Sequence, residues 1–168
     1  MTSAPQPPDE SERLRALREL LLLDSPPEEK YDRIVRFAVE QLDVPIALVS
    51  LVDDDRQWFK ARQGLDVQET SRDIAFCAHA ILQPDVFVVE DAALDERFAD
   101  NPLVTGGPKV RFYAGAPLNA PGGERIGTLC VLDQKPRKLS AVEIAVLQAL
   151  RDLVNDSVAG KPDQEQES

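Results

Sequence analysis

Residues 44–53, VPIALVSLVD, carry the pattern that most limits how this chain can fold. Apolar and β-branched residues occupy both alternating faces of this run, whereas a strand with one wet face would alternate apolar and polar side chains. The run therefore predicts a β-strand that is covered on both sides. A sheet containing such a strand needs a packed layer against each of its faces, which favours a layered fold.

Turn signals and hydrophobic periodicity divide the rest of the chain into short elements. We expect further strands at 57–64, 85–91, 109–120 and 125–134, and helices at 10–24, 26–43, 69–82 and 139–158. An irregular stretch at 92–108, with one or two helical turns, precedes a hairpin whose turn is PGGE. Hairpins near both ends indicate a mostly antiparallel sheet flanked by helices, an α+β fold.

Two of the expected helices begin with a capping-box pattern, in which side chains satisfy the free backbone N–H groups of the first turn. Ser140 and Glu143 form one such pair, and Ser25 and Glu28 form the other, with proline at the first helical position. The helix that follows Ser25 has a single apolar face, made of Tyr31, Ile34, Val35, Ala38 and Leu42.

Length and charge narrow the class of the protein. The 168 residues suffice for one domain, which we place at 10–158 between tails at 1–9 and 159–168 that are predicted to be disordered. The net charge of −11 disfavours binding to nucleic acids and to anionic membranes. No apolar run approaches the roughly 18 residues of a membrane span, and the N-terminus has no secretory pattern, so we expect a cytoplasmic protein.

The triplet Cys77-Ala78-His79 holds the chain's single histidine and one of its two cysteines. Residues two apart on a helix do not face each other, so Cys77 and His79 could act as a nucleophile and its base only in an extended segment. Cys77 instead shares a helical stripe with Ile74 and Ile81, which is typical of a small buried hydrophobe. With Cys130, the triplet supplies at most three metal ligands in poor geometry, so no metal site is expected.

Several segments taken together resemble a GAF domain, in the branch that occurs in bacteria as stand-alone proteins and ahead of histidine kinase or diguanylate cyclase modules. The resemblance covers about 10–158, and RFYAGAPL at 111–118 and GTLCVLD at 127–133 are its most specific motifs. It implies a central, mostly antiparallel sheet of about six strands with the terminal helices on one face. On the other face it implies a small-molecule pocket under the Cys77 helix and the long loop, and a sensory role.

The chain departs from the better-known ligand signatures of this family. Phe87 to Asp91 is the nearest trace of the cyclic-nucleotide signature, but Ala92 follows it. Ala78 separates Cys77 from His79, whereas bilin-binding members have the two side by side. Cys77 and Cys130, our redox candidates, do not match the cysteine pattern of the branch that reduces free methionine sulfoxide. The ligand and any cofactor are therefore unassigned, and a cysteine-dependent reductase of that type is the alternative function.

We expect the pocket to be mostly apolar with a few polar groups, as ligand pockets usually are. Strand parity puts Phe112 and Tyr113 on opposite faces, and we take Tyr113 with Arg111 as the polar pair that faces the ligand. The predicted ligand-binding residues are Trp58, Phe76, His79, Phe98, Arg111, Phe112, Tyr113 and Leu129.

The terminal helices suggest self-association. Apolar residues of the final helix, 141–158, sweep roughly 220° of its circumference, although one sheet face needs little more than about 100°. The leucine run at 20–23 would likewise point in every direction around a helix. We therefore predict a homodimer through the terminal helices, with output through this dimer or through a separate signalling protein.

Overall fold

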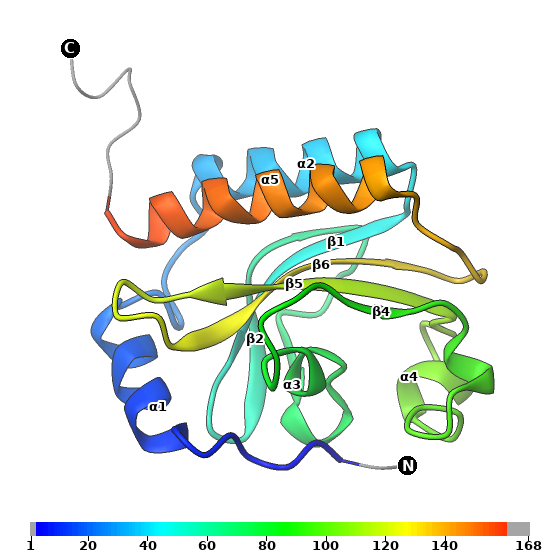
Figure 1. Ribbon diagram of the computed structural model, residues 1–168, viewed down its shortest axis with the longest axis horizontal. Helices are drawn as coiled ribbons and strands as arrows, with labels where there is room; N and C mark the ends of the chain where they lie inside the picture. The colour runs from blue at the N-terminus through cyan, green and yellow to red at the C-terminus, as the bar shows by residue number, and fades with distance from the viewer. Residues whose placement is uncertain (1–2, 161–168) are drawn as a thin grey trace.

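The computed structural model describes residues 3–160, which fold around one antiparallel sheet (Figure 1). The strands are β1 (Ile46–Val52), β2 (Arg56–Gln63), β3 (Glu69–Ser71), β4 (Phe87–Val89), β5 (Phe112–Asn119) and β6 (Arg125–Asp133). They lie in the order β3-β2-β1-β6-β5-β4, and every pair of neighbours is antiparallel. The predicted α+β architecture with a six-stranded sheet is confirmed.

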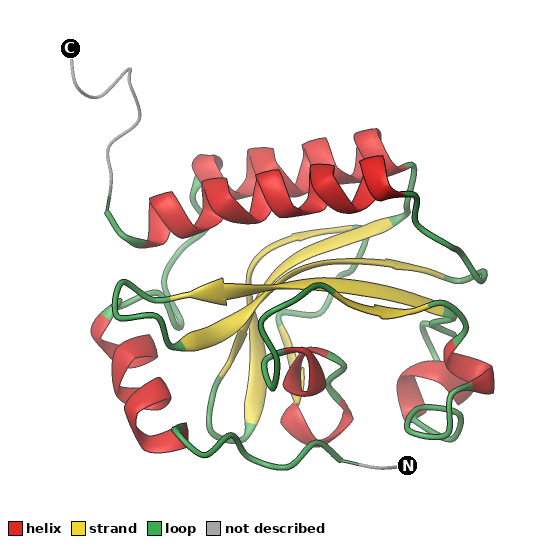
Figure 2. Ribbon diagram, in the orientation of Figure 1, coloured by secondary structure: helices red, strands yellow, loops and turns green. Residues whose placement is uncertain are grey.

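Helices and loops cover both faces of this sheet (Figure 2). The helices are α1 (Glu10–Glu19), α2 (Glu29–Leu42), α3 (Cys77–Ala80), α4 (Pro102–Thr105) and α5 (Ala141–Val158), with 3-10 turns η1 (Arg72–Ile74) and η2 (Ala92–Leu94). The antiparallel pair α2 and α5 lies on one face, and α3 and α4 lie on the other with their connecting segments. In the described part of the chain, no helix has the length and apolar character that crossing a membrane requires.

The central strand β1 is buried at all seven positions, as the two-sided apolar run predicts. Its side chains divide between two hydrophobic clusters, one facing α2 and α5 and one facing α3. The predicted apolar face of α2 joins the first cluster, from Tyr31 to Leu42. At the start of α5, Ser140 and Glu143 form the predicted capping box.

Two local predictions near residue 25 are wrong. Helix α1 ends at Glu19, and Leu21 and Asp24 adopt positive φ angles, so the leucine run lies in turns beyond the helix. Ser25 does not cap α2, which begins at Glu29; its hydroxyl donates to Leu22 O instead. The pair of prolines at 26–27 explains the late start of α2, because a residue that precedes proline is kept out of the helical region.

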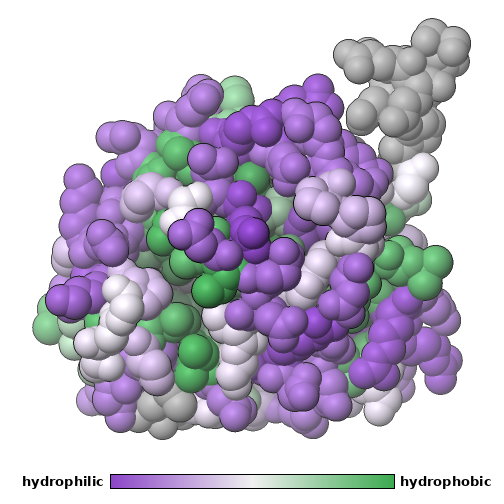
Figure 3. Space-filling view, turned by 180° about the vertical axis from the view of Figure 1, so that it is seen from behind, coloured by the Kyte–Doolittle hydropathy of each residue, from purple (hydrophilic) through white to green (hydrophobic). Residues whose placement is uncertain are grey.

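The predicted N-terminal tail contacts the protein where it is described. Ala4 packs against the cluster under α3, and Pro7 is buried. Residues 1–2 and 161–168 of the predicted tails lie outside the described residues. Figure 3 shows a largely hydrophilic surface with separate hydrophobic patches.

Helix α1 lies apart from α5, at the end of the sheet beside the start of β6, and α2 is the N-terminal helix that packs along α5. Since α1 and α5 do not share a surface within one chain, the joint patch from which we predicted a homodimer is not formed. Exposed apolar side chains remain on α5, where Val142 is 73% and Leu153 53% exposed. A dimer through α5 stays a prediction.

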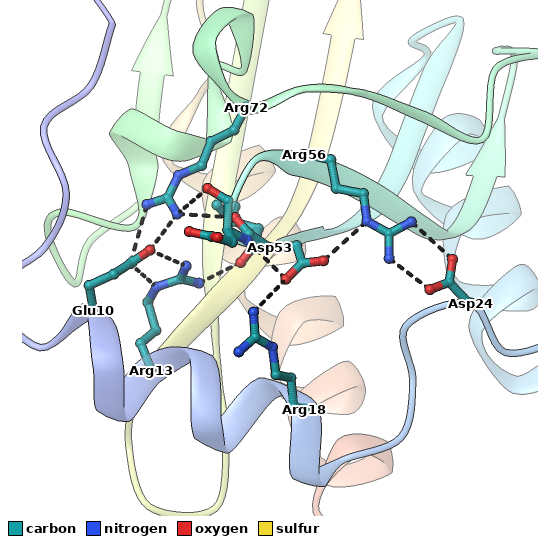
Figure 4. A network of polar contacts seen from close by, with 9 residues as sticks. Glu10, Arg13, Arg18, Asp24, Asp53, Arg56 and Arg72 are labelled. Carbon is teal, nitrogen blue, oxygen red and sulfur yellow. Dashed lines mark hydrogen bonds and ion pairs between the residues drawn. The ribbon is translucent and has the colours of Figure 1, made fainter.

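Charged side chains fasten α1 to the sheet and to η1 (Figure 4). The Arg13 side chain is fully buried, and its Nη1 donates to Val52 O at 2.6 Å. The Glu10 carboxylate accepts from Arg13 Nε at 2.8 Å and from Arg72 Nη1 at 2.5 Å. We call these three side chains, Glu10, Arg13 and Arg72, the α1 clasp. A neighbouring set of ion pairs joins Asp53 to Arg56 and Arg18.

The clasp predicts acid-sensitive stability. Burial raises the pKa of Glu10, but hydrogen bonds from Arg13 and Arg72 outweigh it and lower this pKa from 4.5 to about 2. The carboxylate therefore stabilises the fold fully above the unfolded-state pKa, and this contribution is lost as the pH falls from 4.5 towards 2. Glu10→Gln should lower the free energy of unfolding at pH 7 by about 2 kcal/mol.

Urea unfolding of the wild type and Glu10→Gln at pH 7, 4 and 3 measures this effect. The difference between the two proteins should shrink as the pH falls. Glu29→Gln, which removes the exposed ion pair with Arg36, is the control and should change stability little at any pH. A constant difference for Glu10→Gln across the three pH values would contradict the prediction.

Candidate functional site

Four aromatic side chains contact one another in the layer between α3 and the sheet. The Phe76 and Phe98 rings are stacked with centroids 4.1 Å apart, and Tyr113 lies 5.2 Å from Phe76. Phe87 completes the group at 6.3 Å from Phe98 and 6.1 Å from Tyr113. We call Phe76, Phe87, Phe98 and Tyr113 the aromatic cluster. Its members come from the α3 region, β4, the long loop and β5, so this layer joins four segments that are distant in sequence.

The outer side of the aromatic cluster carries polar and charged groups. The His79 ring meets Phe98 edge-on at 4.9 Å. The Arg97 guanidinium lies 5.0 Å from the Phe87 ring centre and 5.2 Å from that of Phe98, within the range of a cation–π contact. Asp95 accepts two hydrogen bonds from the Arg97 side chain, which hold the pKa of Asp95 below its usual value. The outer side of the aromatic cluster, its rim, therefore carries the ion pair of Arg97 with Asp95, and Arg97 contacts the rings of Phe87 and Phe98.

A row of hydrogen-bonding groups lies at the inner side, against the sheet. Cys77 Sγ donates to Gln57 Oε1 at 2.7 Å, and Ser50 Oγ donates to the same oxygen at 3.1 Å. Ser50 is paired with Thr128 in the β1–β6 register, and Thr128 Oγ1 lies 3.3 Å from the Tyr113 hydroxyl. We call Ser50, Gln57, Cys77, Tyr113 and Thr128 the buried polar row. All five are at most 7% exposed.

Both cysteines are free and buried in this layer. Burial raises the pKa of Cys77 to about 11, even though a hydrogen bond from Ser50 opposes the shift. Burial likewise raises the pKa values of Cys130 and Tyr113 well above their ordinary ranges. At neutral pH the two thiols are therefore protonated and act as small buried groups rather than as thiolate nucleophiles. In the described residues, 3–160, no group of three or more His, Cys, Asp or Glu side chains is arranged to hold a metal ion.

The structure divides the predicted ligand-binding residues between the two layers. Phe76, Phe98 and Tyr113 lie together under α3, and His79 contacts them from the rim. The expected placement is corrected for three others, because Trp58, Phe112 and Leu129 belong to the cluster that faces α2 and α5.

Strand alternation explains this correction, since successive side chains point to opposite faces. Phe112 and Leu129 each neighbour a residue, Tyr113 or Cys130, that points to the α3 side. Arg111, expected to pair with Tyr113 at a ligand, donates to Val104 O and Val110 O instead. Ligand binding by the residues under α3 stays a prediction.

Sequence reasoning missed most of the polar residues of this layer. Ser50 and Thr128 are polar residues in the middle of apolar strands, and that interruption was an available signal. Gln57 and Arg97 had no such signal, because surface strands and loops commonly carry similar residues. Phe87 was noted as the start of a partial cyclic-nucleotide signature but was not predicted to line the pocket.

Two surface hollows border the layer under α3, since Phe59 lines one and Val89 lines the other. One, of about 280 Å³, is lined by residues 59–63 of β2 together with Pro27, Asp32, Arg36 and Gln68. The other, of about 540 Å³, is a shallow depression beside β4 and η2. Neither hollow is lined by the aromatic cluster. The protein's own side chains fill the space around that cluster.

Comparison with known proteins agrees with this arrangement. The family model described as GAF domain matches residues 26–158. A protein of Pseudomonas aeruginosa named cyclic di-GMP phosphodiesterase is 45% identical over 155 residues, which is 92% of this chain and 26% of that protein. This chain therefore spans about a quarter of the length of that relative.

Solved structures share the fold at low sequence identity. The GAF domain of an Acinetobacter phosphoenolpyruvate-protein phosphotransferase superimposes with a TM-score of 0.63 at 19% identity, covering 89% of this chain and 94% of that one. Free methionine-R-sulfoxide reductase from Neisseria meningitidis, solved with its substrate, gives a TM-score of 0.63 at 14% identity, with 96% and 98% covered. At these identities the likeness concerns the fold alone.

The burial of both thiols predicts that they are unreactive in the native protein. Iodoacetamide at pH 8 should label Cys77 and Cys130 at least about a hundredfold more slowly than in the urea-unfolded chain, because labelling needs an exposed thiolate. Peptide mass spectrometry after timed quenching distinguishes the two sites. Labelling of either cysteine at the unfolded rate would show that the thiol is exposed and would contradict its place in the layer.

Gly115 is predicted to keep room for Tyr113. A Cβ atom at Gly115 would lie 2.3 Å from the Tyr113 hydroxyl oxygen, so Gly115→Ala must displace this ring. We expect a loss of about 1–3 kcal/mol in the free energy of unfolding, measured in urea. The loss should be smaller in a Tyr113→Ala background, and Gly107→Ala, where no atom lies within 4 Å, is the control. An equal loss in both backgrounds would refute the contact.

Proposed function

This chain belongs to the GAF domain family, and on that premise we propose that it is a sensory module that binds a small molecule between α3 and the sheet. The observation that carries the proposal is the buried polar row beside the aromatic cluster. Polar groups are costly to bury unless they are hydrogen-bonded, and a purely structural layer would be better packed with apolar side chains. Apolar surroundings with a few fixed polar groups are typical of ligand sites.

The chemistry of the layer suggests the kind of molecule that it would take. The rings of Phe76 and Phe98 offer flat apolar surfaces, and Ser50, Gln57 and Thr128 offer both donors and acceptors. A compact molecule with a flat apolar part and a polar edge would use both. Since side chains fill the layer, such a molecule must displace some of them, and α3 or the long loop must move.

The alternative, a cysteine-dependent reductase of the free methionine sulfoxide type, has less support. Its chemistry needs a thiolate, whereas burial raises the pKa values of both thiols. The likeness to the Neisseria meningitidis reductase extends to the fold and not to the sequence.

We also propose that the signal passes to an output outside this region. The similarity to a much longer Pseudomonas aeruginosa protein named cyclic di-GMP phosphodiesterase favours an output that acts on this second messenger. A separate signalling protein or a homodimer through the exposed residues of α5, Val142 and Leu153, would carry the response. We place this activity in the cytoplasm, where two free cysteines stay reduced.

Native mass spectrometry of the freshly purified protein tests the ligand proposal. We expect a co-purifying molecule of a few hundred daltons, or a rise in Tm with at least one member of a metabolite library. Gln57→Ala should weaken that binding about tenfold or more, since it removes the oxygen that Ser50 and Cys77 share.

Gln63→Ala, at the exposed end of the same strand, is the matched control and should bind as the wild type does. If Gln57→Ala binds the molecule as tightly as the wild type does, the ligand site does not include the buried polar row. If no molecule binds by either measurement, the sensory proposal fails.

A further inference from the structure

We infer that residues 3–13 form a strap that controls access to the layer under α3, through the ion pair between Glu10 and Arg72. The inference rests on the proposed function in taking that layer as the ligand site. The strap lies outside the family match at 26–158 and folds back onto it. Four steps connect the strap to the layer.

The strap contacts the segment that covers the layer, η1 and the start of α3. In Figure 1 the N-terminal segment passes beneath α3. Ser3 Oγ donates to Asp73 O of η1 at 3.3 Å, and Ala4 packs against the cluster that contains Phe76 and Cys77. The strap therefore touches the segment that covers the proposed site.

Arg72, the first residue of η1, connects the strap to the segment that covers the layer. Both terminal nitrogens of its side chain donate hydrogen bonds to the Glu10 carboxylate, and Nη1 also donates to Asp53 O at 3.0 Å (Figure 4). Its backbone N–H donates to Asp55 O at 3.0 Å. Arg72 thus ties α1, the β1–β2 turn and η1 to one point.

The connection continues from Arg72 into the layer. The Arg72 carbonyl accepts from Ala75 N at 3.0 Å, and this short turn leads directly to Phe76 and Cys77. Phe76 forms the stack with Phe98, and Cys77 donates to Gln57. A shift of η1 must therefore displace one member of the aromatic cluster and one member of the buried polar row.

The α1 clasp depends on the charge of Glu10. One carboxylate, Glu10, is the counter-charge shared by two guanidinium groups whose side chains are 1% and 10% exposed. Loss of this carboxylate leaves two buried cations without their counter-charge, and burial of an unpaired charge is strongly unfavourable. The cations can regain water only if the strap and η1 separate. The clasp therefore favours two states, strap closed or strap released, over a gradual loosening.

The thiol of Cys77 serves as the probe of this opening, because iodoacetamide reaches it only when the segment that covers the layer moves. We expect Glu10→Gln to raise the native-state labelling rate of Cys77 about tenfold, with a weak dependence on urea that marks local opening. Val154→Ala, in the other cluster and on the far face of the sheet, is the control. It lowers global stability without touching the strap and should leave the labelling rate in water unchanged.

A second variant keeps the test valid if Glu10→Gln does not fold. Ala4→Asp places a charge in the apolar contact of the strap, leaves the clasp intact and should also accelerate Cys77 labelling. Glu10→Asp, which keeps the charge, should lie between the wild type and Glu10→Gln. If Glu10→Gln and Ala4→Asp label no faster than the wild type, or show the steep urea dependence of global unfolding, the strap is overturned.

This experiment needs no ligand, so its failure can be told from failure of the sensory proposal. Unchanged labelling would refute the strap and leave ligand binding to be judged by mass spectrometry. Faster labelling of both variants with a weak dependence on urea supports the strap as the element that opens the layer, whichever molecule enters there.

Discussion

The pairing of β1 with β6 is the interaction on which the rest of the structure depends. These two strands lie at the centre of the sheet and join the N-terminal half of the chain to the C-terminal half over six residue pairs, Ile46↔Leu132 to Leu51↔Gly127. The two backbones approach so closely at Gly127 that a Cβ atom there would lie 1.9 Å from Ser50 O. Because the register is set here, every side chain of β1 and β6 is assigned to one layer or the other.

The two layers created by this pairing differ in chemistry. The one that faces α2 and α5 is packed with aliphatic and aromatic side chains, as a stabilising core is expected to be. The layer that faces α3 combines aromatic rings with buried hydroxyl, amide and thiol groups. Ser50 and Thr128 lie opposite each other in the central ladder, so two members of the polar row are fixed by the register of β1 and β6. Groups held in this way are suited to recognising a molecule, because little further ordering is needed when it binds.

The N-terminal segment connects this layer to the outside of the domain. Glu10 and Arg13 come from α1, and Arg72 comes from the turn that leads into α3. The connection is made by charges buried among backbone carbonyls, where water screens them little. Electrostatic contacts of this kind are strong when complete and costly when one member is lost, which suits an element that must be either closed or open.

The sequence by itself determined the layered α+β fold and the face that α2 buries. These features follow from local periodicity and capping, which need no knowledge of distant residues: β1 is apolar on both faces, α2 has one apolar stripe, and Ser140 caps α5. Strand alternation also separated Phe112 from Tyr113. The motifs at 111–118 and 127–133 carried the resemblance to the family. The single helix predicted at 69–82 is wrong, because this segment is divided into β3, η1 and the short helix α3.

Only the tertiary structure decided which residues meet. Trp58 and Leu129 were expected in the pocket, but the register of β1 with its neighbours turns them towards α2 and α5. The polar row needs contacts between residues 20 or more positions apart, such as Cys77 with Gln57 and Ser50, and no local pattern encodes such distances. The clasp spans 62 positions from Glu10 to Arg72. The reason is physical: periodicity tells which side of an element is apolar, whereas strand register and helix docking decide what that side faces.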